Sequence, residues 1–154
     1  MRGKAVPKRK INSDPKFGRI DIAKFVNKVM ERGKKTTAQR LVYQAFDYIS
    51  AKTKQDPLDI YDAAIRNVAP NLEVKGKRIG GANYQVPMVV TGDRKINLAH
   101  RWILEAVGNR KGSSLSVRLG EELMAASKGE GAAMKKREDV HRMAEANKAF
   151  AHFA

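Results

Sequence analysis

The sequence contains no cysteine among its 154 residues. Disulfides and thiolate metal sites are therefore excluded, and the absence fits a reducing compartment. The chain also lacks any apolar run close to the roughly 18 residues that a membrane-spanning helix needs. Its first ten residues are charged and include no apolar segment, which argues against a secretory signal. We therefore expect a cytoplasmic protein with no membrane partner.

Acidic residues are scarce, because 16 Asp and Glu stand against 31 Lys and Arg and leave a formal net charge of +15. A charge of this sign and size favours polyanions as partners. It is unevenly distributed: residues 1–35 hold twelve basic and three acidic side chains, which is +9 of the +15. A hydrophobic content of 42% still suffices for one core. We predict a single domain over residues 1–154 that binds a polyanion.

Groups able to carry catalysis or hold a metal are also sparse. Glu138 and His141 have the i, i+3 spacing found in some metal sites. The chain offers no second pair of this kind, and the neighbouring cations of Lys135–Arg137 would repel a metal ion. An ion pair of Glu138 or Asp139 with a nearby basic side chain on a solvated helix is the better explanation. We predict no metal site and no catalytic residues.

Two further features have simpler explanations than a ligand site. The stretch Gly76–Arg78 lacks the leading glycine and the Ser or Thr after the lysine that a phosphate-binding loop requires. Trp102 lies on an apolar helical stripe beside Ile103, which favours a core position over a base-stacking platform. We expect no cofactor and no small-molecule substrate.

Apolar residues recur at helical spacing in six segments of the chain. The first runs from Ile22 to Met30, and the third begins at Asp56-Pro57, an N-cap followed by proline. The other four begin with a possible Thr36/Gln39 capping box, with Asp93 as a cap, with Ser113 or Ser114, and at Ala132, from which the sixth continues to about Phe150. Residues 1–18, interrupted by prolines and rich in cations, are expected to form a flexible basic arm.

Residues 71–90 are predicted to form a β-hairpin that turns on Gly80-Gly81, because two glycines supply the positive φ angles of a tight turn. This turn pairs Ile79 with Ala82, Arg78 with Asn83, Lys77 with Tyr84, Val74 with Pro87 and Leu72 with Val89. Apolar side chains that can pack on a body lie toward the base: Leu72, Val74, Val86, Met88 and Val89. The polar tip is expected to join no core and to contact an anion, with Tyr84 as a possible stacking ring.

These elements predict a mainly α fold. We expect a single helical bundle of about six helices with a protruding β-hairpin arm and a basic N-terminal extension.

Basic residues gather in separate loops and arms, which is typical of phosphate-backbone binding over an extended surface. The groups are the arm (Arg2, Lys4, Lys8, Arg9, Lys10), the corner between the first two helices (Arg32, Lys34, Lys35), the hairpin (Lys75, Lys77, Arg78) and the start of the following helix (Arg94, Lys95, Arg101). Structured RNA suits this arrangement better than a uniform duplex, because an arm can order in a groove while the hairpin contacts a second place.

The hairpin sequence from Gly76 to Pro87, GKRIGGANYQVP, resembles the signature of the small-subunit ribosomal protein number seven family. The stretch from Gly131 to His152 is similar to the last helix of that family in its bacterial form, and Arg101-Trp102 before an apolar run is a third match. The resemblance covers essentially the whole chain. It adds the last-helix cations Lys135, Lys136 and Arg142 to the expected RNA contacts.

The resemblance implies a protein that binds the 3′ major domain of small-subunit ribosomal RNA and nucleates assembly of the subunit head. It also implies that the hairpin and last helix lie near the exit-site transfer RNA and the path of the leaving messenger RNA, beside neighbouring head and platform proteins. The alternative function is an architectural DNA-binding protein, but the apolar wedge that such proteins often carry at an arm tip is replaced here by Gly80-Gly81. A nuclease, the third possibility, would need clustered carboxylates.

Overall fold

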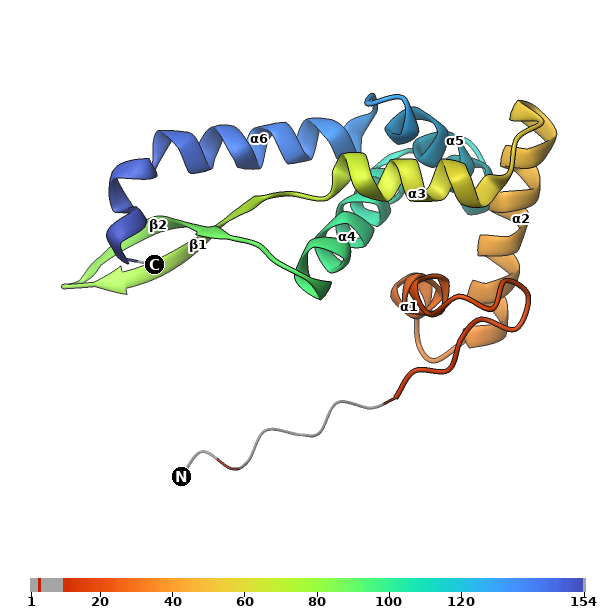
Figure 1. Cartoon of the computed structure of the whole chain (residues 1–154), viewed down its shortest axis with the longest axis horizontal. Helices are drawn as coiled ribbons and strands as arrows, with labels where there is room; N and C mark the ends of the chain where they lie inside the picture. Colours follow the sequence, from red (N-terminus) through yellow and green to blue (C-terminus); the bar gives the residue numbers. More distant parts are fainter. Residues whose placement is uncertain (1–2, 4–9, 154) are drawn as a thin grey trace. The chain divides into compact units, whose positions relative to one another are not determined.

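The computed structural model describes residue 3 and residues 10–153, and the chain divides into two compact units, one up to Gln39 and one from Arg40. In the described residues the fold consists of seven helices, the last of them a 3-10 helix, and one antiparallel pair of strands (Figure 1). The mainly α class predicted from the sequence is confirmed.

The first unit begins with a closed turn around Asp14, whose side chain is only 2% exposed. The Asp14 carboxylate accepts hydrogen bonds from the backbone N–H groups of Lys16 and Phe17, each over 3.1 Å, and the Asp14 carbonyl accepts one from Gly18 N. This Asx-type turn leads into helix α1, Ile20–Val29, which buries the apolar face around Phe25. Residues 14–18, expected as the end of a flexible arm, therefore form a hydrogen-bonded turn.

Helix α2, Lys35–Thr53, starts one residue before the predicted capping box. The carbonyl of Lys34 accepts the first helical bond, from Ala38 N over 3.1 Å, so Lys34 occupies the N-cap position. Thr36 is inside the helix, and the predicted Thr36/Gln39 capping box is wrong.

The second unit contains the rest of α2 and helices α3 (Pro57–Val68), α4 (Asp93–Asn109), α5 (Leu115–Ser127) and α6 (Ala132–Ala146). Its core side chains include Phe46, Tyr61, Ile103, Leu119 and Leu123, all at most 1% exposed. They come from the predicted apolar stripes of α2, α3, α4 and α5, which pack together because each helix has only one apolar face to bury.

The predicted caps of α3 and α5 are confirmed, whereas that of α4 is wrong. Asp56 Oδ1 accepts from Leu58 N over 2.9 Å, and Ser114 caps α5 through Val117 N. Asp93 is instead the first residue of α4, and Gly92 is the N-cap with a φ of 54°. Glycine adopts a positive φ at little cost, so Gly92 takes the N-cap position, one residue before the predicted cap Asp93.

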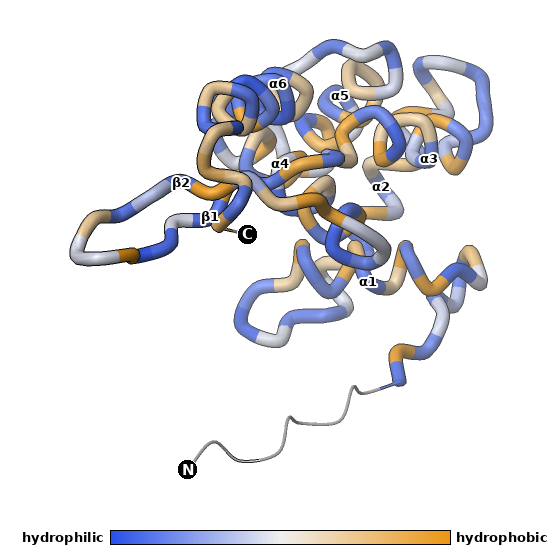
Figure 2. The backbone as a smooth tube through the Cα atoms, turned by 60° about the vertical axis from the view of Figure 1, so that its left-hand side comes forward, coloured by the Kyte–Doolittle hydropathy of each residue, from blue (hydrophilic) through white to orange (hydrophobic). Residues whose placement is uncertain are grey.

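Strands β1 (Leu72–Ile79) and β2 (Ala82–Val89) pair as predicted, from Leu72 with Val89 to Ile79 with Ala82. Gly80 and Gly81 have φ angles of 57° and 90°, as the tight turn requires. Figure 2 shows hydrophobic colour at the base of β2 and mostly hydrophilic or neutral residues along the arm. Val86 is buried at the base, but Val89 is 76% exposed, so its predicted packing on the body is wrong.

The sixth predicted helix is interrupted before Phe150. Helix α6 ends at Ala146, and a 3-10 helix, η1, follows over Lys148–Phe153. Asn147 ends α6 by donating to the Met143 carbonyl from both its backbone N (3.1 Å) and its side chain Nδ2 (2.7 Å). An asparagine that bonds to the backbone in this way favours a helix end. The chain then turns onto β2.

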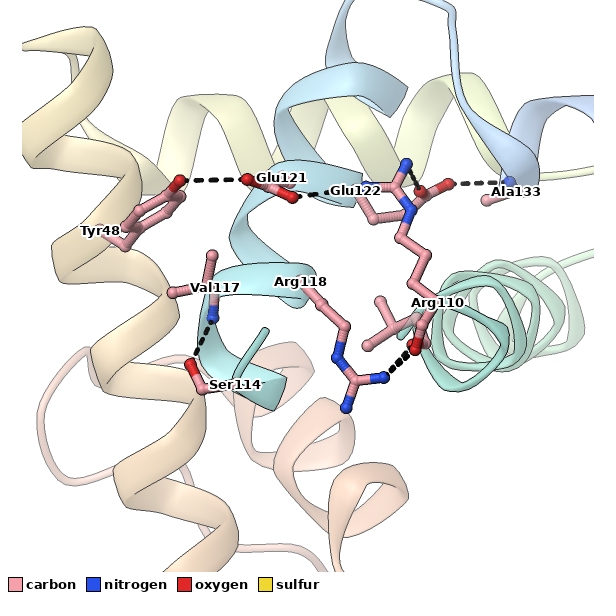
Figure 3. Close-up of polar contacts among 9 residues, drawn as sticks. Tyr48, Arg110, Ser114, Val117, Arg118, Glu121, Glu122 and Ala133 are labelled. Carbon is pink, nitrogen blue, oxygen red and sulfur yellow. Dashed lines mark hydrogen bonds and ion pairs between the residues drawn. The ribbon is translucent and has the colours of Figure 1, made fainter. Parts of the chain in front are cut away.

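A polar cluster along α5 joins α4, α5 and α6 (Figure 3). Glu122 is fully buried, and its Oε1 accepts from Ala133 N, at the start of α6, over 2.9 Å. Arg110, just after α4, places Nη2 2.7 Å from Glu122 Oε2, and Arg118 donates to the carbonyl oxygens of Val107 and Arg110. This cluster connects the end of α4 to the start of α6, the two helices beside the hairpin base.

Candidate nucleic-acid interface

In the first unit, the predicted RNA-contacting residues of the α1–α2 corner are exposed cations: Arg32, Lys34 and Lys35. Arg32 and Gly33 adopt left-handed φ angles of 51° and 74°, and Lys34 N donates to the Glu31 carbonyl over 3.0 Å. A tight corner of this kind projects successive side chains outward. Lys10 is also exposed, while Arg2, Lys4, Lys8 and Arg9 lie outside the described residues.

In the second unit, predicted RNA contacts come from the hairpin, α4 and α6. Most of them are exposed: Lys75, Arg78, Arg94, Arg101, Lys135, Lys136 and Arg142; Lys77, Tyr84 and Lys95 are half-buried. On α6, Lys136 lies 3.4 Å from Glu105, and Arg142 pairs with Asp139. These ion pairs on exposed side chains are weak and leave the cations available to a polyanion.

Glu73 is not among the residues predicted from the sequence to contribute to the site, but its carboxylate holds two of the predicted cations in place. It is 8% exposed, on β1 at the base of the hairpin. Its Oε2 accepts from Arg94 Nη2 over 2.7 Å and from Arg94 Nε over 3.1 Å, and its Oε1 lies 3.0 Å from Lys75 Nζ. Burial alone would raise the pKa of Glu73, but the hydrogen bonds and charges of Arg94 and Lys75 outweigh burial, and the pKa is lowered. Glu73 is therefore an ionised anchor for both cations.

The start of the hairpin is also connected to α4 and α6 through Asn71. Lys95 Nζ donates to Asn71 Oδ1 over 2.7 Å, and Asn71 N donates to His141 Nε2 over 3.3 Å. Burial and the nearby Arg137 lower the pKa of His141, which keeps the ring neutral and able to accept this bond. His141 thus has a structural role, and no group of three His, Asp or Glu able to hold a metal occurs among the residues that the structure describes.

One face of the hairpin is covered by the C-terminal segment, contrary to the prediction of a tip with no core to join. The Tyr84 ring lies 5.1 Å from that of Phe150 and 5.5 Å from that of Phe153, measured between centroids. Lys77 Nζ donates to the carbonyl oxygen of Phe153 over 2.5 Å. The sequence did not predict this contact, because its helical periodicity placed Phe150 at the end of a continuous sixth helix. Arg78, nearer the turn, remains exposed.

A groove of about 430 Å³ opens between the hairpin base, α4 and α6. Its apolar lining includes Leu98, Trp102, Val140 and Met143, and its polar lining includes Gln85, Arg94 and Arg101. Trp102 is 6% exposed, which agrees with the core position predicted for it, whereas Met143 is 49% exposed. Sequence reasoning did not find this groove, because its residues are spread over four elements.

No helix in the described part of the chain is long and apolar enough to cross a bilayer.

Comparison with known proteins identifies relatives along the whole chain. Residues 1–148 match the model of the family described as ribosomal protein S7p/S5e. A protein of Azoarcus sp. (strain BH72), named small ribosomal subunit protein uS7, is 54% identical over 152 residues, covering 99% of this chain and 97% of its own length. The proteins of the same name from Polynucleobacter asymbioticus and Paraburkholderia phymatum are 55% and 53% identical over the same shares of both chains.

Proposed function

The chain belongs to the ribosomal protein S7p/S5e family, and on this premise we propose that it binds the 3′ major domain of small-subunit ribosomal RNA as an early step in assembly of the subunit head. It is a ribosomal protein of the small subunit and not an enzyme. Its partners are ribosomal RNA and the neighbouring head and platform proteins. The hairpin and the C-terminal helix lie near the exit-site transfer RNA and the path of the leaving messenger RNA.

The observation that carries the proposal is the distribution of exposed cations. The α1–α2 corner presents Arg32, Lys34 and Lys35, and the hairpin with α4 presents a second set that includes Arg78 and Arg101. Two basic surfaces on loops, turns and an arm suit a folded RNA, which offers phosphates in several directions. They are less suited to the one regular groove of a DNA duplex.

A competition assay tests this function. The protein is bound to labelled duplex DNA at moderate salt, and a 3′ major domain fragment of small-subunit RNA is added as competitor. We expect the RNA fragment to displace the DNA at much lower concentration than an unlabelled duplex of equal length does. Equal competition by the two nucleic acids would contradict the proposal and favour an architectural DNA-binding protein. Chelation of divalent metal ions from the protein, followed by restoration of Mg²⁺ for RNA folding, should leave the affinity unchanged.

A further inference from the structure

The groove between the hairpin base, α4 and α6 combines an apolar floor with a cationic edge. Trp102 and Met143 contribute to the floor, and the guanidinium groups of Arg94 and Arg101 contribute to the edge. Its volume of about 430 Å³ falls within the range of roughly 300–1,000 Å³ that small-ligand sites occupy. The groove therefore has room for a single building block of a polymer, and its lining suits a molecule with one apolar and one anionic part.

The two arginines of the groove are in different states. Arg94 is held by Glu73, through Nη2 at 2.7 Å and Nε at 3.1 Å. Arg101 is exposed and has no ion-pair partner among residues 10–153. Among the described residues that line the groove, Glu73 is the one carboxylate, and it is balanced by Arg94 and by Lys75, whose Nζ lies 3.0 Å away. The groove thus carries a net positive charge, and Arg101 is the cation free to take an external anion.

We propose that this groove binds one unstacked ribonucleotide of the RNA, with its base against the apolar floor and its phosphate on Arg101. A nucleotide unites the planar apolar part and the anionic part that the lining requires, and unpaired bases of folded RNA are recognised by insertion against apolar and aromatic side chains. Gln85 lines the same groove from β2 and offers an amide to the base edge. The inference rests on the proposed function and adds the class of ligand for one part of that surface.

The chain contains a single tryptophan and no cysteine, which makes the groove directly observable. Trp102 fluorescence reports on the floor, and the Met143→Cys variant introduces one thiol into the groove lining, at a position that is already 49% exposed. Filter binding of the 3′ major domain RNA fragment is measured in parallel. We expect the RNA to change Trp102 fluorescence with the same midpoint as binding, and to protect the Met143→Cys thiol from alkylation. Glu130→Cys, on the exposed α5–α6 link, is the control and should stay reactive.

The Arg101→Ala variant tests the phosphate contact, and Arg66→Ala, an exposed cation on α3 outside the groove, is its matched control. Arg101→Ala should weaken binding by roughly 5- to 100-fold and abolish the fluorescence change at equal occupancy, as loss of one nucleotide contact predicts. Arg66→Ala should retain the fluorescence change.

Three outcomes would overturn the inference while leaving the proposed function intact. The first is full RNA binding with no change in Trp102 fluorescence. The second is a fluorescence change that Arg101→Ala leaves unaltered. The third is protection of the Met143→Cys thiol only in the assembled subunit and not by RNA alone, which would show that the groove is filled by something other than a nucleotide of this RNA fragment. Absence of any binding to the RNA fragment would instead contradict the proposed function, and the inference with it.

Discussion

Tyr84, in the second strand of the hairpin, and Phe150, near the C-terminus, lie with their ring centroids 5.1 Å apart and their planes inclined by 56°. Phe153 adds a third ring at 5.5 Å from Tyr84. The hairpin and the 3-10 helix η1 thus share a small aromatic cluster outside the main core. In the free protein, this cluster keeps the predicted stacking ring of Tyr84 engaged within the chain.

Replacing both phenylalanines, Phe150→Ala with Phe153→Ala, should release η1 from the hairpin. We expect the free energy of unfolding to fall by more than about 0.5–1.5 kcal/mol, because the variant loses the aromatic pair contribution and, in addition, the apolar area that the two rings bury. Amide hydrogen exchange of β2 should become faster. If Tyr84 stacks on RNA, its release should raise RNA affinity by roughly 2- to 10-fold, because the competing internal contact is gone. Lys148→Ala, at an exposed position of the same segment, is the control and should change neither the free energy of unfolding nor the exchange of β2. Slower exchange in the Phe150→Ala, Phe153→Ala variant would contradict the prediction.

The lowered pKa of Glu73 predicts a pH dependence of stability. A carboxyl whose pKa is lower in the folded state than its ordinary 4.5 stabilises the fold fully above that value. This contribution is lost as pH falls from about 4.5 through the lowered pKa. Glu73→Gln should therefore reduce the urea midpoint at pH 7, and the difference from the original protein should shrink toward pH 3. Glu145→Gln, which removes an exposed ion pair with Lys148, is the control and should show little difference at either pH.

Gly131 and Gly112 form a matched pair, because both have a φ of 98° but only Gly131 has close neighbours. A Cβ at Gly131 would lie 2.8 Å from Glu122 Oε1, the oxygen that accepts from Ala133 N, whereas a Cβ at Gly112 meets nothing within 4 Å. Gly112→Ala should cost about 1–2 kcal/mol for the left-handed backbone alone. Gly131→Ala should cost a further 1–3 kcal/mol, since it displaces a buried hydrogen bond. Equal losses in urea unfolding would show that Glu122 moves aside freely.

The α1–α2 corner is tested by Lys34→Ala combined with Lys35→Ala. Both side chains are exposed, so unfolding stability should change by less than about 1 kcal/mol. RNA affinity should fall, and the dependence of log affinity on log salt should flatten by about 0.7–0.9 per lost phosphate contact. Arg66→Ala with Lys128→Ala removes the same charge elsewhere and should affect the slope less. If circular dichroism showed that the Lys34→Ala, Lys35→Ala variant does not fold, the corner lysines would have a structural role instead.

Shortening the hairpin separates the arm from the helical part of the second unit. None of residues 75–85 is buried, so replacing them with a short glycine-containing turn should leave the helices folded. Primary binding to the RNA fragment should persist through the α1–α2 corner and α4, while reconstituted subunits should differ in exit-site transfer RNA occupancy. A loss of primary binding by several orders of magnitude, with the fold retained, would make the hairpin the main anchor. The original protein reconstituted in parallel provides the control.

Local chemistry within the sequence determined most of the elements. Most of the helical stripes, the Asp56 and Ser114 caps and the full hairpin register were predicted correctly, because each depends on residues that are neighbours in the chain or across one tight turn. Met143, on the predicted stripe of the sixth helix, is instead 49% exposed. The N-caps predicted at Asp93 and Thr36 were wrong by only one or two residues, since more than one neighbouring residue can cap the start of a helix.

Only the tertiary structure decided what the predicted RNA-binding residues contact within the protein. Glu73 is hydrogen-bonded to Arg94, which is 21 residues away in the sequence, and Lys77 to the carbonyl of Phe153, which is 76 residues away. Periodicity cannot predict such pairs, because they depend on how α4, α6 and the C-terminal turn are placed around the hairpin. The fully buried Glu122 is the clearest case: its carboxylate is stable in the core only because packing brings Arg110 and the start of α6 to it. Composition and charge predicted a polyanion partner, whereas long-range packing decided which cations are held and which, like Arg101, are free.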